Sequence, residues 1–152
     1  MKIVCNSSIL IALDSIGYLN ILKDLFKEIL IPKAVRKEVF GKRKLPTFIK
    51  CIEISESIAL KVLEGNLEVG ESEAICLYEE INANLLIIDD LEGRRVAERL
   101  GLTITGTLGV LLLAKKERLI DAIRPLLDGI ISHGFRVAEE LHKEILTKAG
   151  EA

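Results

Sequence analysis

Two adjacent aspartates, Asp89 and Asp90, follow an unbroken run of four aliphatic residues, Leu85 to Ile88. A short apolar run with β-branched residues predicts a strand that is buried on both faces of a parallel sheet. The aspartates then lie at the carboxyl end of this strand, which is the edge where open α/β sheets bind ligands. Acidic residues at a strand end are also common helix caps, so a chemical role and a capping role are both open.

Other side chains with oxygen ligands are expected at the same edge of the sheet. Asn6 follows the first expected strand and Thr105 follows the last, while Glu38 and Glu71 lie on helices that can present their carboxylates there. Hard oxygen ligands without a His or Cys partner favour Mg²⁺ or Mn²⁺ over zinc. Such an ion lowers the pKa of an attacking water, which suits phosphodiester hydrolysis. The candidate ligands are Asn6, Glu38, Glu71, Asp89 and Asp90.

The elements that must position these residues alternate along the chain. Strands are expected at about 2–5, 28–31, 51–54, 85–88 and 102–105, the third as a short edge strand and the fourth at the centre. Helices are expected at about 9–16, 18–26, 32–40, 56–63, from 71, and at 92–100, 108–116, 121–131 and 136–148. This alternation predicts a three-layer α/β/α fold with a central parallel sheet of about four to five strands. A length of 152 residues fits one domain, 1–152, which the helices from about 121 complete.

The net charge of −2 provides no overall attraction for nucleic acid, so RNA binding requires a local patch. The loop 41–44, GKRK, and the preceding helix together carry six positive charges, from which we select Arg36, Lys42, Arg43 and Lys44 as candidate RNA contacts. Arg94 is a further candidate because its planar guanidinium suits phosphate. The alternative for each is a solvated surface residue, and for Arg94 or Arg95 a pair with a neighbouring glutamate.

Features that indicate another compartment are not expected. No apolar run approaches the roughly 18 residues of a membrane span, and no signal peptide precedes the first strand. Three cysteines without paired spacing predict buried reduced thiols rather than a zinc site or disulfides. We therefore expect a cytoplasmic protein.

Five segments of the chain resemble, in the right order, the signature segments of the PIN-domain superfamily, nearest to its VapC-like prokaryotic branch. They are NSSILIAL, PKAVRKEVF, GESEAI, LLIIDDLEGRRVAERLG and TITGTLGVLLLAKK. The resemblance implies a Mg²⁺- or Mn²⁺-dependent endoribonuclease that cuts single-stranded RNA. It also implies that the protein is often a homodimer and the toxin of a toxin–antitoxin pair. The apolar helices after Leu108 suit a homodimer face or a groove for an antitoxin helix, or simply extra core burial.

Matching by position, the resemblance implies a catalytic set of Asn6, Glu38, Glu71 and Asp90, with Asp89 beside it and Glu73 as a substitute for Glu71. The family pattern has aspartate at position 6, and asparagine lacks both the charge and the ability to accept a proton. Three interpretations are open: a natural loss, a change that Asp89 compensates, or a substitution made to silence a toxic protein. The alternative function is a catalytically inactive PIN-fold module that binds RNA or a protein partner.

Overall fold

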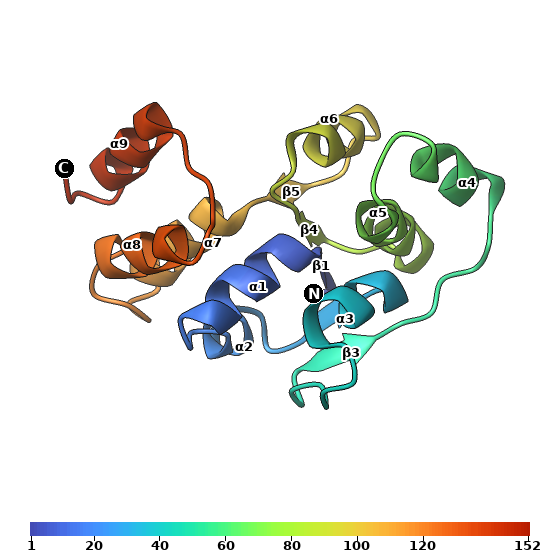
Figure 1. Ribbon diagram of the computed structural model, residues 1–152, viewed down its shortest axis with the longest axis horizontal. Helices are drawn as coiled ribbons and strands as arrows, with labels where there is room; N and C mark the ends of the chain where they lie inside the picture. Colours follow the sequence, from blue (N-terminus) through green and yellow to red (C-terminus); the bar gives the residue numbers. More distant parts are fainter.

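The computed structural model describes residues 1–152, which fold around a five-stranded, all-parallel sheet with helices on both faces (Figure 1). The strands are β1 (Ile3–Cys5), β2 (Ile29–Ile31), β3 (Ile49–Cys51), β4 (Leu85–Ile87) and β5 (Ile104–Thr105). The helices are α1 (Ser7–Ser15), α2 (Asn20–Phe26), α3 (Lys33–Phe40), α4 (Ile58–Glu64), α5 (Val69–Ile81), α6 (Leu91–Arg99), α7 (Thr107–Lys116), α8 (Arg124–Ser132) and α9 (Glu139–Lys148). The predicted three-layer α/β/α fold with a parallel sheet is confirmed.

The middle of the sheet is β1, because the strand order is β3-β2-β1-β4-β5. The prediction that the strand at 85–88 is the central one was therefore wrong. β1 and β4 are both fully apolar, so burial alone cannot tell which of them is central. The register places Val4 opposite Leu30 on one side and opposite Leu86 on the other. The chain steps outward from β1 to β3 and then returns to the other side of β1, so the order reverses between β1 and β4.

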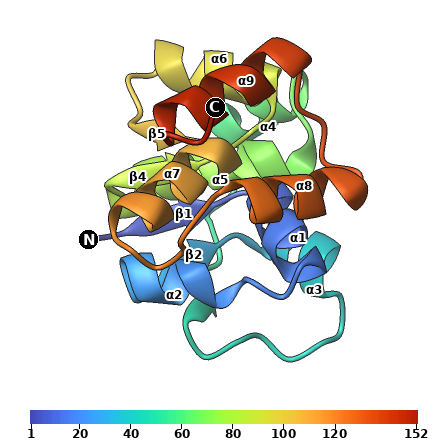
Figure 2. The ribbon, with the colours of Figure 1, turned by 90° about the vertical axis from the view of Figure 1, so that its left-hand side faces the viewer.

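The two faces of the sheet bury separate apolar clusters, because alternate residues of each strand point to opposite faces. Ile3 and Cys5 of β1 face the larger cluster, which contains residues of α1, α2, α3, α7, α8 and α9. Val4 and Leu86 face the smaller cluster, which is covered mainly by α5 and α6. Figure 2 shows α7 and α8 in front of the strands, on the face of the sheet that buries the larger cluster. The inner strands β1, β2 and β4 are therefore largely buried on both faces, as the apolar run at 85–88 predicted for β4, whereas the edge strands β3 and β5 are only partly buried.

The third strand runs from Ile49 to Cys51 rather than over 51–54 as predicted. Its register with β2 pairs Ile29 with Ile49 and Ile31 with Cys51, and Phe48 and Ile49 are the buried residues of this segment. Pairing with β2 and burial at 48–49 therefore draw the strand two residues earlier than its own sequence indicated. It is an edge strand, as expected.

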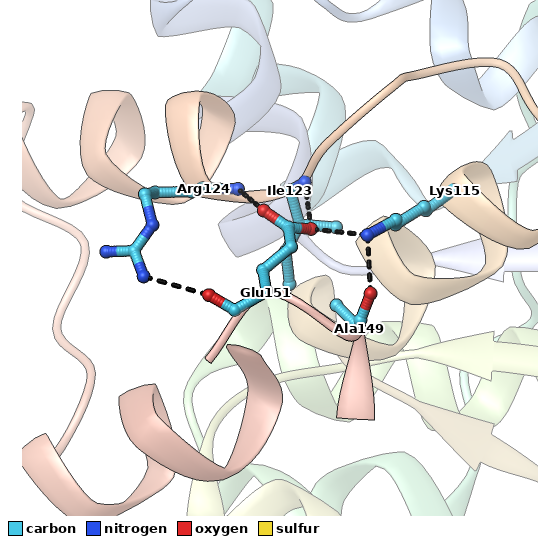
Figure 3. Close-up of polar contacts among 5 residues, drawn as sticks. All are labelled: Lys115, Ile123, Arg124, Ala149 and Glu151. Carbon is cyan, nitrogen blue, oxygen red and sulfur yellow. Dashed lines mark hydrogen bonds and ion pairs between the residues drawn. The ribbon is translucent and has the colours of Figure 1, made fainter. Parts of the chain in front are cut away.

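Helix α8 begins at Arg124, not near Asp121 as predicted, because a residue from the chain end caps it. The Glu151 carboxylate accepts hydrogen bonds from the backbone N–H of Ile123 at 2.8 Å and of Arg124 at 3.1 Å. Lys115 of α7 donates to the same carboxylate at 2.9 Å and also to the carbonyl of Ala149 (Figure 3). The carboxyl-terminal residues thus join α7, α8 and α9.

All three cysteines are free thiols, as predicted, but only Cys5 is buried, while Cys51 and Cys76 are half-buried. Burial raises the pKa of the Cys5 thiol, so this group stays protonated. None of the helices has both the length and the apolar character that crossing a bilayer requires.

Candidate functional site

The buried polar side chains are all found at the carboxyl edge of the sheet. They are Asn6 and Ser7 after β1, Glu71 and Ser72 in the first turn of α5, and Thr107 after β5. Ser72 donates to the Glu68 carbonyl at 3.0 Å and Thr107 is bonded to Asp89. The Ser7 hydroxyl and one oxygen of Glu71 have no hydrogen-bond partner. Leaving a buried polar atom unsatisfied costs about 1–3 kcal/mol, so these atoms mark a candidate site.

Glu71 is the most perturbed carboxylate at this edge. It is only 6% exposed, and its Oε1 accepts from the backbone N–H of Glu68 at 3.3 Å. Its Oε2 is the unpartnered oxygen. Burial, followed by the neighbouring Asp90 carboxyl, raises the pKa of Glu71 from 4.5 to about 7. A protonated Glu71 can donate to Asp90, whereas the ionised pair leaves two anions in contact.

Asp90 lies at the surface above Glu71 and is exposed. Its Oδ2 accepts from the backbone N–H of Gly93 at 3.1 Å, so it caps the start of α6. Gly93 packs directly on Glu71, because a Cβ added there would lie 2.9 Å from Glu71 Oε2 and 2.7 Å from Ile88 Cδ1. The first turn of α6 therefore covers Glu71 and holds Asp90 beside it.

Asp89 points away from this pair toward the start of α7. Its Oδ1 accepts from the Thr107 N–H at 2.8 Å and its Oδ2 accepts from the Thr107 hydroxyl at 2.6 Å. Both Asp89 oxygens thus cap the start of α7, although Asp89 follows β4 and α7 follows β5. This arrangement weakens the interpretation that Asp89 compensates for Asn6.

Asn6 lies where β1 passes into α1, and its backbone N–H donates to the Ile87 carbonyl of β4 at 2.9 Å. Its side chain is 7% exposed and makes no capping hydrogen bond. A Cβ built on Gly70 would lie 3.5 Å from Asn6 Oδ1 and 3.9 Å from Ser7 Oγ, so both side chains face the first turn of α5. Asn6 therefore lies close to the first turn of α5, which carries Glu71.

Glu38 is exposed on α3, because Val35 and Val39 form the buried face of that helix. The side chains of His, Cys, Asp and Glu form no group of three or more that could hold a metal ion. The structure therefore brings Glu71 and Asp90 together but joins no third carboxylate to them. Glu73, the possible substitute for Glu71, accepts from the N–H of Ala34 at 3.1 Å and so caps α3 instead.

The basic loop 41–44 does not lie beside the pair of Glu71 and Asp90. It leads into β3 and therefore lies toward the amino edge of the sheet. Arg43 bonds Asp14 near the end of α1 at 3.4 Å and the Val39 carbonyl at 2.9 Å, and it lies 5.5 Å from the ring centre of Phe40. Lys42 and Lys44 are exposed and Arg36 is half-buried on α3. The structure thus does not place this loop beside Glu71 and Asp90.

Arg94 is the cation that follows the acidic pair most closely. It is half-buried and donates from Nη1 to the Ile88 carbonyl at 3.0 Å. Arg95 instead forms an exposed ion pair with Glu92 at 2.9 Å. The two arginines therefore separate into one that turns toward the sheet edge and one that stays on the helix surface.

The residues at this edge fit a hard divalent cation. Mg²⁺ is often held by one or two carboxylates with several waters, and Mn²⁺ accepts similar oxygen ligands. The unpartnered Glu71 oxygen, the adjacent Asp90 carboxylate and the amide oxygen of Asn6 are ligands of this kind. A cation at Glu71 and Asp90 would also neutralise the repulsion that raises the pKa of Glu71.

The fold and the site together define a parallel α/β protein with an acidic pair where the strand order reverses. A family model described as the PIN domain matches residues 2–151, so the chain belongs to the PIN-domain family. PIN domains have a nuclease-type fold and are generally dependent on divalent metal ions. No curated protein matches the chain.

Two participants in this corner were missed by the sequence analysis. Ser7 was not among the candidate residues, yet its buried hydroxyl has no partner. Gly93 was not singled out, although a Cβ there would lie only 2.9 Å from Glu71 Oε2. The only signal in the sequence for the close approach of α6 to Glu71 was a glycine in the first turn of a helix, three residues after Asp90.

Proposed function

We propose that the protein is a metal-dependent endoribonuclease that cuts single-stranded RNA with Mg²⁺ or Mn²⁺. The observation that carries this proposal is the pair of Glu71 and Asp90 at the reversal point of the sheet, with a buried Glu71 oxygen that lacks a partner. Oε1 of Glu71 is bonded to the Glu68 N–H, but the buried Oε2 has no hydrogen-bond partner. Membership of the PIN-domain family supports the same reaction class.

Glu71 and Asp90 would hold the cation, with Asn6 as a neutral oxygen ligand. When bound, the ion supplies a water of lowered pKa and stabilises charge on the phosphate. The chain's own contribution is to keep the two carboxylates in contact under the first turn of α6 and to exclude water from the Glu71 side. Without a cation, the pKa of Glu71 near 7 lets this group hold a proton near neutral pH, and binding of the ion would release that proton.

A second candidate is a PIN-fold module that binds RNA or a partner without cutting. Two observations favour it: position 6 is asparagine, and Glu38 is exposed and joins no acidic group of three. A site with two carboxylates and an amide holds a divalent cation less strongly than one with four carboxylates. The two candidates therefore differ in metal affinity and in turnover.

The test is cleavage of a mixed-sequence single-stranded RNA during titration with Mn²⁺ and Mg²⁺, for the wild type, Asn6→Asp and Asp90→Asn. We expect Asp90→Asn to lower the cleavage rate by about 100-fold or more, because a ligand of the cation is lost. Asn6→Asp should raise metal affinity and cleavage, since a charge is restored at the corner. Metal binding is followed independently by the rise in melting temperature on adding the ion.

Glu92→Gln is the matched control, because Glu92 is an exposed carboxylate in the same helical turn as Asp90 and is paired only with Arg95. It should leave cleavage unchanged. If neither the wild type nor Asn6→Asp cuts RNA or responds to either metal, the nuclease proposal fails and the binding module is favoured. If Asp90→Asn cuts as well as the wild type, the assignment of the site is wrong.

The cellular part of the proposal is a toxin of a toxin–antitoxin pair that acts in the cytoplasm as a homodimer. It rests on the resemblance of the five signature segments and on family membership. Growth arrest on induction, relieved by Asp90→Asn, tests the toxin role. Light scattering of the purified protein tests the dimer.

A further inference from the structure

A cleft of about 450 Å³ opens between α6, β5, α7 and α9, and its lining includes Asp89 and Leu91, the residues on either side of Asp90. Asp89 and Arg94 lie at one wall, and Leu141 and Lys148 of α9 lie at the opposite wall. Figure 1 shows α9 and α6 at the same end of the molecule, with β5 and α7 between them. The volume falls within the roughly 300–1,000 Å³ of pockets that hold small ligands. The cleft is therefore large enough for one organic ligand.

The glycines of the TGTLG segment keep the floor of this cleft open. A Cβ on Gly106 would lie 2.7 Å from Asp89 Oδ1 and 2.9 Å from Arg94 Nη1, and one on Gly109 would collide with the Thr105 hydroxyl. Both glycines line the cleft. The absence of a side chain at Gly106 thus lets Asp89 and Arg94 lie against the start of α7, and the absence of one at Gly109 leaves room for the Thr105 hydroxyl.

The charges in the cleft suit an anion with an apolar part. Arg94 uses one donor on the Ile88 carbonyl and forms no ion pair with a carboxylate, so most of its five N–H donors remain available. Lys148 pairs only with Glu144 at the surface, at 3.1 Å, and both side chains are more than half exposed. Asp89 is the one carboxylate at the cleft, and its oxygens are bonded to Thr107.

The apolar wall consists of leucines from α6, α7 and α9. Leu91 is 61% exposed and Leu141 is 42% exposed, so both present apolar surface to the cleft. Leu108 and Leu112 of α7 complete this wall. A planar base can pack on these side chains and on the face of the Arg94 guanidinium, while a phosphate contacts the two cations.

We propose that this cleft is a nucleotide subsite, which seats one nucleoside and its phosphate next to the bond that is cut. The inference rests on the proposed ribonuclease function and assigns its substrate contact to Arg94, Lys148 and the leucine wall. It replaces the basic loop 41–44 as the expected RNA contact, since that loop lies toward the other edge of the sheet. Base preference is then decided by the leucine wall, not by the acidic pair.

The experiment measures binding of each of the four nucleoside 5′-monophosphates by backbone amide shifts, with EDTA present so that no cation contributes. Arg94→Gln should weaken binding about tenfold, because charge-assisted hydrogen bonds to the phosphate are lost. Arg95→Gln is its matched control and should change binding less than about twofold, since Arg95 is paired on the surface.

Leu141→Gln provides a second variant in case Arg94→Gln does not fold, because Leu141 lies on the exposed face of α9. It should weaken binding about threefold to fivefold by removing apolar contact with the base. Leu119→Gln is the control, with 40% exposure against 42% for Leu141 and a position outside the cleft. Shifts should gather on residues of α6, α7 and α9.

The inference is overturned if the mononucleotides move no signals of the cleft, or if Arg94→Gln and Arg95→Gln weaken binding equally. It is also overturned if the protein cuts RNA and neither Arg94→Gln nor Leu141→Gln changes KM or base preference. If mononucleotides bind in the cleft with the expected losses but RNA is never cut, the subsite stands and the nuclease proposal fails. The two failures are thus distinguishable.

Discussion

Glu71 and Glu151 are two glutamates of low exposure with opposite surroundings. Glu151 receives hydrogen bonds from two backbone N–H groups and from the Lys115 ammonium. Burial alone would raise the pKa of Glu151, but these bonds outweigh it and the pKa lies below its ordinary value. Glu71 receives one backbone hydrogen bond and faces another carboxyl, and its pKa is raised to about 7.

Glu151 is thus a structural carboxylate, whereas the surroundings of Glu71 suit a chemical role. The anion of Glu151 is what joins α7, α8 and α9, so the fold gains stability from its charge. The anion of Glu71 lowers the stability of the fold, because it is buried against Asp90 without a cation. Perturbed carboxylates of the second kind gather at functional sites, where a ligand offsets the destabilisation.

The largest expected effect concerns the charge of Glu71. The folded pKa of about 7 lies above the ordinary 4.5, so its share of stability is fully present below about pH 4.5 and is lost as the pH rises through about 7. A shift of this size corresponds to up to about 3 kcal/mol. Without divalent metal, Glu71→Gln should therefore be more stable than the wild type at about pH 8.

Urea unfolding at several pH values in EDTA measures this difference, and acid pH serves as the internal control because the two proteins should converge there. Adding Mn²⁺ at about pH 8 should stabilise the wild type and not the variant. A variant less stable than the wild type throughout would remove the contrast with Glu151.

A smaller effect of opposite sign is expected for Glu151. Because its folded pKa is depressed, its stabilisation is present above the ordinary pKa and is lost as the pH falls through the folded value. Glu151→Ala should lower the free energy of unfolding at neutral pH by about 2 kcal/mol, since it leaves the start of α8 uncapped. Hydrogen exchange should show the loss in α8 and α9 first.

Glu144→Ala is the control for Glu151→Ala, because Glu144 makes only an exposed pair with Lys148. It should change stability by less than about 0.5 kcal/mol. Equal losses from both variants would show that Glu151 does not hold these helices together.

The smallest expected effect concerns the glycine that covers Glu71. Gly93→Ala places a Cβ within 2.9 Å of Glu71 Oε2 and 2.7 Å of Ile88 Cδ1, and such overpacking costs about 1–3 kcal/mol. The gain in helix propensity of roughly 1 kcal/mol offsets part of this loss. We expect a net destabilisation of about 1 kcal/mol by thermal unfolding.

Gly70→Ala is the matched glycine, because its Cβ would make only ordinary contacts of 3.5 Å with Asn6 Oδ1 and 3.6 Å with Val35 Cγ2. It should be neutral or stabilising. If Gly93→Ala is also stabilising, α6 does not press on Glu71 as the structure indicates.

Much of the fold was predictable from local patterns. Apolar runs of three or four residues marked the strands, and their alternation with amphipathic segments led to the parallel sheet. The start of α8 was not predictable, because the Glu151 carboxylate that caps it comes from 27 residues further along the chain. The central position of β1 was not predictable either, since β1 and β4 are equally apolar.

The candidate site was also predictable from the sequence only in part. The segment at Asp89 and Asp90 was identified from strand-end position, and GESEAI pointed to Glu71 through the family resemblance. Which aspartate meets Glu71 and which caps α7 depends on where Thr107 lies after β5. The exposure of Glu38 depends on which face of α3 packs on the rest of the fold.

The sequence by itself determined which residues bear oxygen ligands and on which edge of the sheet they gather, because periodicity and strand direction are local properties. Only the tertiary structure decided which of them meet. Hydrogen-bond partners such as Thr107 for Asp89, Ala34 for Glu73 and Asp14 for Arg43 come from distant segments. These contacts divert candidate residues into structural roles, and they leave one buried oxygen of Glu71, next to Asp90, without a partner.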